Sequence, residues 1–226
     1  PNKKGTSVRY GEKGNWLIPD MPSLSSATLR STAFKGEWIT TGDRVETPYY
    51  SVLFNPDGSI ASLYDKELCR EWVKGDFNKL KLYSDTPGNY DAWDILPNYK
   101  DKQIPYEISE PLHFAGADGE CAEFICTLKT EKSEWQRIIR LFRRGRGIEV
   151  ENNVDWHEKH VLAKAEFTPD VLTRKVLCDT SAGYTERETH RNTTWQQARF
   201  ECCHHKWCDM SEFGGGIALI NDSKYG

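Results

Sequence analysis

The chain has 226 residues, of which 38% are hydrophobic and 12% aromatic, and a formal net charge of −4. This apolar content is sufficient for a packed core and excludes a disordered chain. The acidic balance argues against a nucleic-acid partner, because phosphate binding requires a basic surface. The dense basic run at residues 137–146 is interrupted by apolar residues, which predicts a strand with a solvated basic face followed by a turn.

The sequence shows no membrane or export signal. No apolar run approaches the ~20 residues that a membrane-spanning helix requires, and residues 1–5 lack the apolar core of a signal peptide. The seven cysteines are odd in number, and Cys202 and Cys203 are adjacent, which disfavours a disulfide framework. These features predict a cytoplasmic protein with no membrane partner. Because the chain opens without Met, we also expect its true start to lie upstream.

Two domains are expected. Residues 1–44 are rich in Gly, Pro, Ser and Thr, which predicts edge strands and loops. We expect them to form the end of a small linking β domain. From Val45 onward the pattern of strands and turns is clearer, and residues 45–226 are expected to belong to a second domain. Near its start, Tyr49–Phe54 and Ile60–Tyr64 flank the sequence Asn55-Pro-Asp-Gly58, which predicts a hairpin with a tight turn.

Several segments in the rest of the chain alternate between apolar and polar residues with the period of a strand. Strands are expected at residues 79–83, 121–128, 135–142, 148–156, 162–167, 176–178, 198–207 and 217–220. No window keeps a helical apolar period for three turns, and residues 65–75 are expected to form a short helical turn at most. Many strands joined by short turns predict an all-β fold, a large antiparallel β-sandwich.

The first candidate site is the segment from Asp85 to Asp94. Pro87 and Gly88 predict a loop that presents Asp85, Asp91 and Asp94 beside Tyr90 and Trp93. Sugar sites combine carboxylate oxygens, which accept hydroxyl hydrogen bonds, with an aromatic face on which the ring stacks. Paired carboxylates also suit a glycosidase acid and base, which require a separation of ~5–9.5 Å. The alternative is a capped loop whose Trp93 anchors in the core.

Two further clusters lie near the end of the chain. A strand through Cys202 and Cys208 would hold their thiols roughly 20 Å apart, too far for one zinc ion. His190 or His205 could pair with Asp209 or Glu212 for acid–base work, because histidine titrates near neutral pH. A structural histidine is the alternative. The sequence contains no nucleophile elbow, phosphate loop or dinucleotide fingerprint.

Seven segments together resemble one enzyme family. They are Glu46-Thr-Pro-Tyr-Tyr50, Asn55-Pro-Asp-Gly-Ser-Ile-Ala-Ser-Leu-Tyr-Asp-Lys66, Asp91-Ala-Trp-Asp-Ile95, Val154-Asp-Trp-His-Glu158, Thr189-His-Arg-Asn-Thr-Thr-Trp195, His205-Lys-Trp-Cys-Asp-Met-Ser-Glu212 and Ala218-Leu-Ile-Asn-Asp-Ser-Lys-Tyr-Gly226. In this order they resemble the C-terminal β region of glycoside hydrolase family 38, the retaining α-mannosidases, most of all the bacterial and cytosolic type. The resemblance covers Val45–Gly226.

The resemblance implies a zinc-dependent enzyme that cleaves terminal α-linked mannose through a covalent glycosyl-aspartate intermediate. It places the nucleophile and the zinc ligands in an N-terminal α/β domain outside this chain. It also implies a galactose-mutarotase-like super-sandwich that continues past Gly226. The expectation is therefore an inactive fragment that holds no catalytic residue and no metal, with an α-mannoside and the N-terminal catalytic domain as its partners.

On the same resemblance, the expected substrate-binding residues are Asp91, Trp93, Asp94, His190 and Asn192. Asp91 and Asp94 would accept hydroxyl hydrogen bonds or order the pocket wall, with Trp93 packed beside them. His205, Trp207 and Glu212 are expected to be architectural. Two rival functions fit a sandwich fold: an aldose 1-epimerase-like enzyme with a His–Glu acid–base pair, and a free-standing carbohydrate-binding module with an exposed aromatic platform.

Overall fold

The computed structural model describes residues 6–11, 14–19, 38–90, 93–118 and 120–222. Antiparallel strands make up nearly all of its regular structure. In chain order the strands are β1 (Thr6–Gly11), β2 (Gly14–Pro19), β3 (Ile39–Thr41), β4 (Arg44–Glu46), β5 (Tyr50–Phe54), β6 (Ile60–Asp65), β7 (Arg70–Glu71), β8 (Val73–Ser84), β9 (Gln103–Ile104), β10 (Glu107–Ala117), β11 (Cys121–Lys129), β12 (Glu134–Phe142), β13 (Ile148–Asp155), β14 (Val161–Pro169), β15 (Lys175–Thr180), β16 (Gly183–Glu188), β17 (Trp207–Glu212) and β18 (Gly215–Ile220). A 3-10 helix, η1 (Tyr99–Asp101), and a helix, α1 (Thr194–Ala198), complete the described structure.

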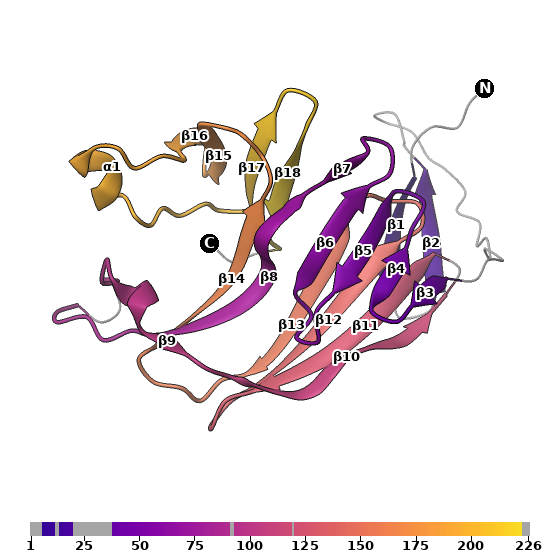
Figure 1. Cartoon of the computed structure of the whole chain (residues 1–226), viewed down its shortest axis with the longest axis horizontal. Coiled ribbons are helices and arrows are strands. Elements are labelled where there is room, and N and C mark those ends of the chain that lie inside the picture. Colours follow the sequence, from indigo (N-terminus) through magenta and orange to yellow (C-terminus); the bar gives the residue numbers. More distant parts are fainter. Residues whose placement is uncertain (1–5, 12–13, 20–37, 91–92, 119, 223–226) are drawn as a thin grey trace.

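The strands form a sandwich with side extensions. The five-stranded sheet β3-β4-β5-β6-β7 lies across the four-stranded sheet β10-β11-β12-β13 (Figure 1). Two more sheets extend it: β14-β8-β9, and β16-β15-β17-β18. The hairpin β1-β2 forms a fifth sheet. This confirms the predicted all-β antiparallel sandwich. The division at residue 44 stays a prediction; the sheet that contains β5 and β6 also includes β3.

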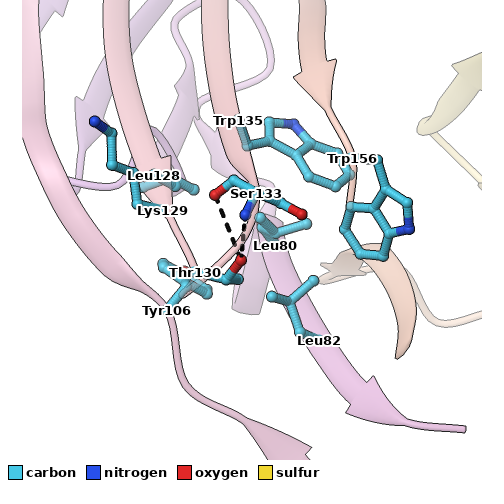
Figure 2. Close-up of a pocket in the computed structure, with 9 residues that line it drawn as sticks. All are labelled: Leu80, Leu82, Tyr106, Leu128, Lys129, Thr130, Ser133, Trp135 and Trp156. Atoms are coloured by element: carbon cyan, nitrogen blue, oxygen red, sulfur yellow. Dashed lines mark hydrogen bonds between the residues drawn. The ribbon is translucent and has the colours of Figure 1, made fainter. Parts of the chain in front are cut away.

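The main core fills the space between the two large sheets. Apolar side chains from β4, β5 and β6 meet those from β11 and β12, and the fully buried members include Val52, Ala122 and Ile139. A smaller cluster lies between β8 and β11, where Leu80, Leu82 and Leu128 are buried beside partly covered aromatic rings (Figure 2). Burial of this apolar surface is the main force that holds the sheets together.

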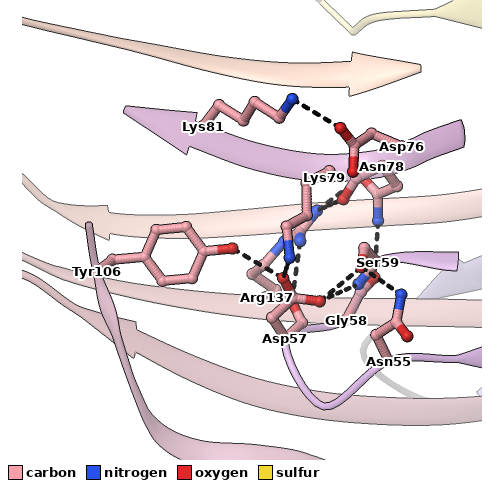
Figure 3. A network of polar contacts seen from close by, with 10 residues as sticks. All are labelled: Asn55, Asp57, Gly58, Ser59, Asp76, Asn78, Lys79, Lys81, Tyr106 and Arg137. Atoms are coloured by element: carbon pink, nitrogen blue, oxygen red, sulfur yellow. Dashed lines mark hydrogen bonds and ion pairs between the residues drawn. The ribbon is translucent and has the colours of Figure 1, made fainter. Parts of the chain in front are cut away.

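The turn between β5 and β6 points into the sandwich. The predicted hairpin is confirmed, with Tyr50 opposite Asp65 and Phe54 opposite Ile60. The second half of its turn is nevertheless buried from Asp57 to Ser59, and Asp57 is only 2% exposed. Figure 3 shows why a polar turn is stable there. The Asp57 carboxylate accepts hydrogen bonds from Ser59 and from Tyr106 Oη (2.8 Å) and is paired with Lys79. A buried charge satisfied in this way avoids most of its desolvation cost.

Three sequence predictions were wrong or incomplete. Residues 199–206 are not a strand, since β17 begins only at Trp207, and residues 194–198 form helix α1 instead. Residues 66–69 make a turn that leads into β7, without a helix. The strands β4, β7, β9, β10 and β16, and all of β17 beyond Trp207, were not predicted. Outside these segments the expected strands are confirmed, with ends that differ by a few residues and a longer β8.

Candidate functional site

The loop after β8 presents aromatic side chains to solvent. Tyr90 adopts a positive φ of 57°, and its carbonyl accepts hydrogen bonds from the backbone N–H groups of Trp93 (2.8 Å) and Asp94 (3.0 Å). This tight turn leaves Tyr90 74% exposed and Trp93 86% exposed. The alternative in which Trp93 anchors in the core is therefore wrong. Asp94 is exposed beside it, and Asp91 lies outside the described residues.

The turn that carries His190 and Asn192 is organised by the side chain of Gln196. Its Oε1 accepts hydrogen bonds from the backbone N–H groups of Asn192 (2.7 Å) and Thr193 (2.9 Å). Its amide nitrogen donates to Glu188 (2.8 Å) and lies 3.1 Å from His190 Nε2. Thr193 completes a capping box at the start of α1, which satisfies backbone donors that a helix otherwise leaves unpaired. The turn is thus ordered by local contacts.

The loop and the turn project from the same end of the molecule. In Figure 1 the magenta loop between β8 and β9 and the helix α1 both lie at the left. Among the described residues, no hydrogen bond or ion pair joins Trp93 or Asp94 directly to His190 or Asn192. The residues that follow each segment are joined instead, because Tyr99 Oη donates to Glu201 at 2.6 Å. Sequence reasoning missed this link, because Tyr99 and Glu201 are 102 residues apart and belong to no local motif.

Among the described residues, no hydrogen bond or ion pair joins His190 to Asp209 or Glu212, which the sequence offered as possible acid–base partners; His190 contacts Gln196 instead. Glu212 instead forms an ion pair with Arg70 and accepts the N–H of Leu172 at 2.6 Å. Asp209 accepts a hydrogen bond from Ser211 Oγ at 2.7 Å. The pKa of Glu212 is lowered, because its hydrogen bonds with the Leu172 backbone and with Arg70 favour the carboxylate. Glu212 therefore links β17 to β7 and to the segment before β15, whereas Asp209 makes a local contact within β17.

Comparison with known proteins decides the family. The sequence model described as "Glycosyl hydrolases family 38 C-terminal domain" matches residues 45–226. The chain belongs to glycosyl hydrolase family 38. The resemblance found in the seven motifs is thereby confirmed, over the same residues.

Curated relatives of this family 38 chain are α-mannosidases. It is 32% identical to "Alpha-mannosidase G" of Dictyostelium discoideum over 200 residues, which is 80% of this chain and 17% of the relative. It is 31% identical to "Alpha-mannosidase 2C1" of Homo sapiens over 216 residues, which is 92% of this chain and 20% of the relative. The chain thus spans about a fifth of the length of these relatives.

A solved structure supports the fold. The crystal structure of an α-mannosidase from Enterococcus faecalis V583 superimposes with a TM-score of 0.62 over 97% of this chain and 30% of that chain. The two sequences are 11% identical in that comparison, so the likeness shows the shared fold. The family 38 assignment and the sandwich architecture therefore agree.

The resemblance places the ligands of the zinc ion outside this family 38 chain, and the described residues offer no alternative set of ligands. No group of three or more His, Cys, Asp or Glu side chains among them is placed to hold a metal ion. The sequence argument against zinc at Cys202 and Cys208 assumed that one strand runs through both residues. That assumption is wrong, because residues 199–206 are irregular. In the described structure, no step of a reaction can be assigned to a metal held by these side chains.

A small, partly open cavity among the described residues is too small for a sugar. It lies in the smaller core cluster, where the rings of Trp135 and Trp156 meet edge to face at 6.0 Å and a turn through Thr130 and Ser133 closes one side (Figure 2). Its volume is about 10 Å³, which is roughly the space that one water molecule requires. We interpret it as a packing gap beneath Trp156. The exposed loop and turn remain the candidate site.

Proposed function

We propose that this chain is the β-sandwich part of a retaining α-mannosidase that hydrolyses terminal α-linked mannose, and that it supplies no nucleophile and no zinc ligand. Family membership and the curated α-mannosidase relatives support this proposal. On this view the catalytic chemistry belongs to an N-terminal domain that holds the zinc ion, and the chain alone is inactive. The sandwich contributes to the shape of the substrate pocket.

The candidate site would serve as one wall of that pocket. The loop between β8 and β9, which carries Trp93 and Asp94, and the segment around α1, which follows His190 and Asn192, lie at one end of the molecule (Figure 1). An exposed indole offers the apolar face on which a sugar ring stacks, and an ionised carboxylate accepts hydrogen bonds from its hydroxyls. The observation that carries the proposal is the 86% exposure of Trp93, since a large aromatic ring held in solvent by a tight turn is typical of a contact surface.

The test is the substitution Asp94→Ala in the complete enzyme. We expect kcat/KM for an aryl α-mannoside to fall by about tenfold or more, as for the loss of a hydrogen bond to a charged group. Asp101→Ala is the matched control, because Asp101 lies in η1 at the far end of the same loop. An unchanged kcat/KM for Asp94→Ala would remove the loop from the pocket. Mutarotase activity of the chain alone would instead favour the epimerase.

We also propose a cytoplasmic location. All seven cysteines carry free thiols, and free thiols are typical of reducing compartments. Neither helix in the described ranges has the length and apolar content that a bilayer crossing requires. Fractionation of cells that express the complete protein tests the location, and recovery in a secreted or organellar fraction would contradict it.

A further inference from the structure

Tyr99 is a buried residue at the end of an exposed loop. It is the first residue of η1 and is only 2% exposed. The centroid of its ring lies 5.0 Å from that of Tyr83 of β8, and the angle between the two ring planes is 88°. Such edge-to-face packing stabilises an aromatic pair beyond the burial of its surface. The Tyr99 hydroxyl donates to Glu201 Oε1 at 2.6 Å. The end of the 85–98 loop is therefore held between β8 and the segment that precedes β17.

Glu201 binds two partners from different parts of the fold. While Oε1 accepts from Tyr99, Oε2 accepts from Lys164 Nζ of β14 at 2.6 Å. Burial would raise the pKa of Glu201, but the hydrogen bonds from Lys164 and Tyr99 outweigh it and lower that pKa. The carboxylate stays ionised near neutral pH. Hydrogen bonds to an ionised acceptor are shorter and stronger than those between neutral groups.

A second set of contacts supports the first. Tyr83 Oη donates to Glu166 Oε1 at 2.6 Å, and Lys81 Nζ lies 3.0 Å from Glu166 Oε2. Burial and the neighbouring Glu166 carboxylate raise the pKa of Tyr83 to about 12, so it remains a donor. Lys81 and Lys164 stand opposite each other on β8 and β14. The carboxylates of Glu166 and Glu201 neutralise this like-charge pair, which would otherwise destabilise the sheet.

Glu201 is also connected to the His190 turn. The residue before it, Phe200, accepts a hydrogen bond at its carbonyl from Arg191 Nη2 at 3.0 Å. Arg191 lies between His190 and Asn192 in the turn. Contacts therefore run from this turn through Phe200 and Glu201 to Tyr99, where the loop with Trp93 and Asp94 ends. The loop is bonded to the carboxylate of Glu201, and the turn is bonded to the carbonyl of the residue before it.

We propose that Glu201 is a positioning residue that fixes the Trp93–Asp94 loop relative to the His190–Asn192 turn, so that both present one surface to the mannoside. This inference rests on the proposed function, because it assigns a role to Glu201 in the same pocket wall. Glu201 touches neither the substrate nor the reacting atoms. It acts through Tyr99 on one side and through Phe200 and Arg191 on the other.

The experiment compares Glu201→Gln and Tyr99→Phe in the complete enzyme with the control Glu149→Gln. Glu149 pairs with Arg140 on the outer face of β13 and has no contact with Tyr99. We expect amide hydrogen exchange at residues 93–101 to accelerate in both test variants and to stay unchanged in the control. For an aryl α-mannoside we expect KM to rise about tenfold with kcat within about twofold, since ground-state and transition-state binding weaken alike.

The double variant distinguishes one shared contact from two separate effects. If Tyr99 and Glu201 act through their mutual hydrogen bond, the combined rise in KM equals that of one substitution, because the second removes nothing further. A multiplicative rise would overturn the proposal. Unchanged amide exchange at residues 93–101 in Glu201→Gln would overturn it as well.

Failure of this inference can be separated from failure of the proposed function. If Asp94→Ala lowers kcat/KM while Glu201→Gln leaves KM unchanged, the loop forms part of the pocket and the positioning role of Glu201 is wrong. If Asp94→Ala and Glu201→Gln both leave kcat/KM and KM unchanged, the proposal that these segments form a wall of the substrate pocket is wrong. The positioning role of Glu201, which rests on that proposal, is then wrong as well. Amide hydrogen exchange at residues 93–101 measures in either case whether Glu201 stabilises the loop, because the exchange rate does not depend on enzyme activity.

Discussion

Arg137 of β12 donates a hydrogen bond from Nη1 to the main-chain carbonyl of Asp57 at 3.0 Å, across the interior of the sandwich. The same guanidinium binds Asn78 of β8 through Nη2, at 2.9 Å to its carbonyl and 2.7 Å to its side chain. Arg137 is 1% exposed, so the prediction of a solvated basic face is wrong at this residue. One side chain therefore joins the β5–β6 turn, β8 and β12, and it satisfies carbonyl groups that would otherwise be buried without a partner (Figure 3).

Replacement of Arg137 by Leu should destabilise the fold strongly. It would leave the acceptors on Asp57 and Asn78 buried without a donor, and the loss of one partner in a buried charged network costs about 3–5 kcal/mol. Arg140→Leu is the matched control on the same strand. Arg140 pairs with Glu123, Glu149 and Glu151 on the outer face, where these carboxylates stay partly exposed to water and each such ion pair contributes about 1 kcal/mol or less. Urea unfolding of both variants measures the difference, and similar midpoints would contradict this account of the turn.

Gly58 is required in the buried turn for two reasons that can be separated. Its φ is +76°, and a Cβ added there would lie 2.9 Å from Cys126 Sγ and 3.3 Å from Ile139 Cδ1. Gly42 also has a positive φ, +59°, but nothing lies within 4 Å of an added Cβ. We expect Gly42→Ala to cost about 1 kcal/mol from backbone strain alone. Gly58→Ala should cost about 2–4 kcal/mol, because overpacking of the core is added to the strain.

The double variant Gly58→Ala with Cys126→Ala tests the steric part. Removal of the thiol gives the new methyl group space. The double variant should therefore lose less folding free energy than the sum of the losses in the two single variants. Calorimetric or urea unfolding of the four proteins in the cycle gives the coupling. Strict additivity would show that contact with Cys126 is not the reason for glycine at this position.

Asp57 should make the fold sensitive to acid. Burial would raise its pKa, but hydrogen bonds from Lys79, Ser59 and Tyr106 outweigh it and lower the pKa from 3.8 to about 2. The folded state therefore holds this proton less tightly than the unfolded state does. The resulting stability is fully present above about pH 4 and is lost as the pH falls toward 2; it amounts to about 2 kcal/mol. Urea midpoints of wild type and Asp57→Asn between pH 5 and pH 2 measure it, and the variant should lose less stability over that range.

The strands could be predicted because their pattern is local. Alternating residues identified β11, β12 and β13, and the turn residues Asn55–Gly58 identified the β5–β6 hairpin. Burial could not be predicted in the same way, since it depends on which sheet covers which face. Val154 shares an alternation with Ile148 and Val150, yet it is 41% exposed. The inward orientation of the hairpin turn depends on Arg137, which is 80 residues distant from Asp57.

The error at residues 198–207 has a local cause. Apolar residues such as Ala198 and Phe200 suggested a strand, but Thr193 and Gln196 form a capping box that starts α1. Thr-x-x-Gln is a helix-start signature that is readable in the sequence. The Tyr99–Glu201 contact has no such signature, so the link between the two halves of the candidate site required the structure.

Gln196 should control the order of the His190–Asn192 turn. Its side chain accepts both the Asn192 and the Thr193 N–H groups, so Gln196→Ala exposes these donors to water. A lost helix cap costs about 1 kcal/mol, and we therefore expect exchange of these two amides to accelerate about fivefold. Gln197→Ala is the control, because its Nε2 reaches the Arg191 carbonyl only at 3.5 Å. In the complete enzyme, Gln196→Ala should also lower kcat/KM for an aryl α-mannoside. Equal exchange in the two variants would show that the turn is held by contacts other than Gln196.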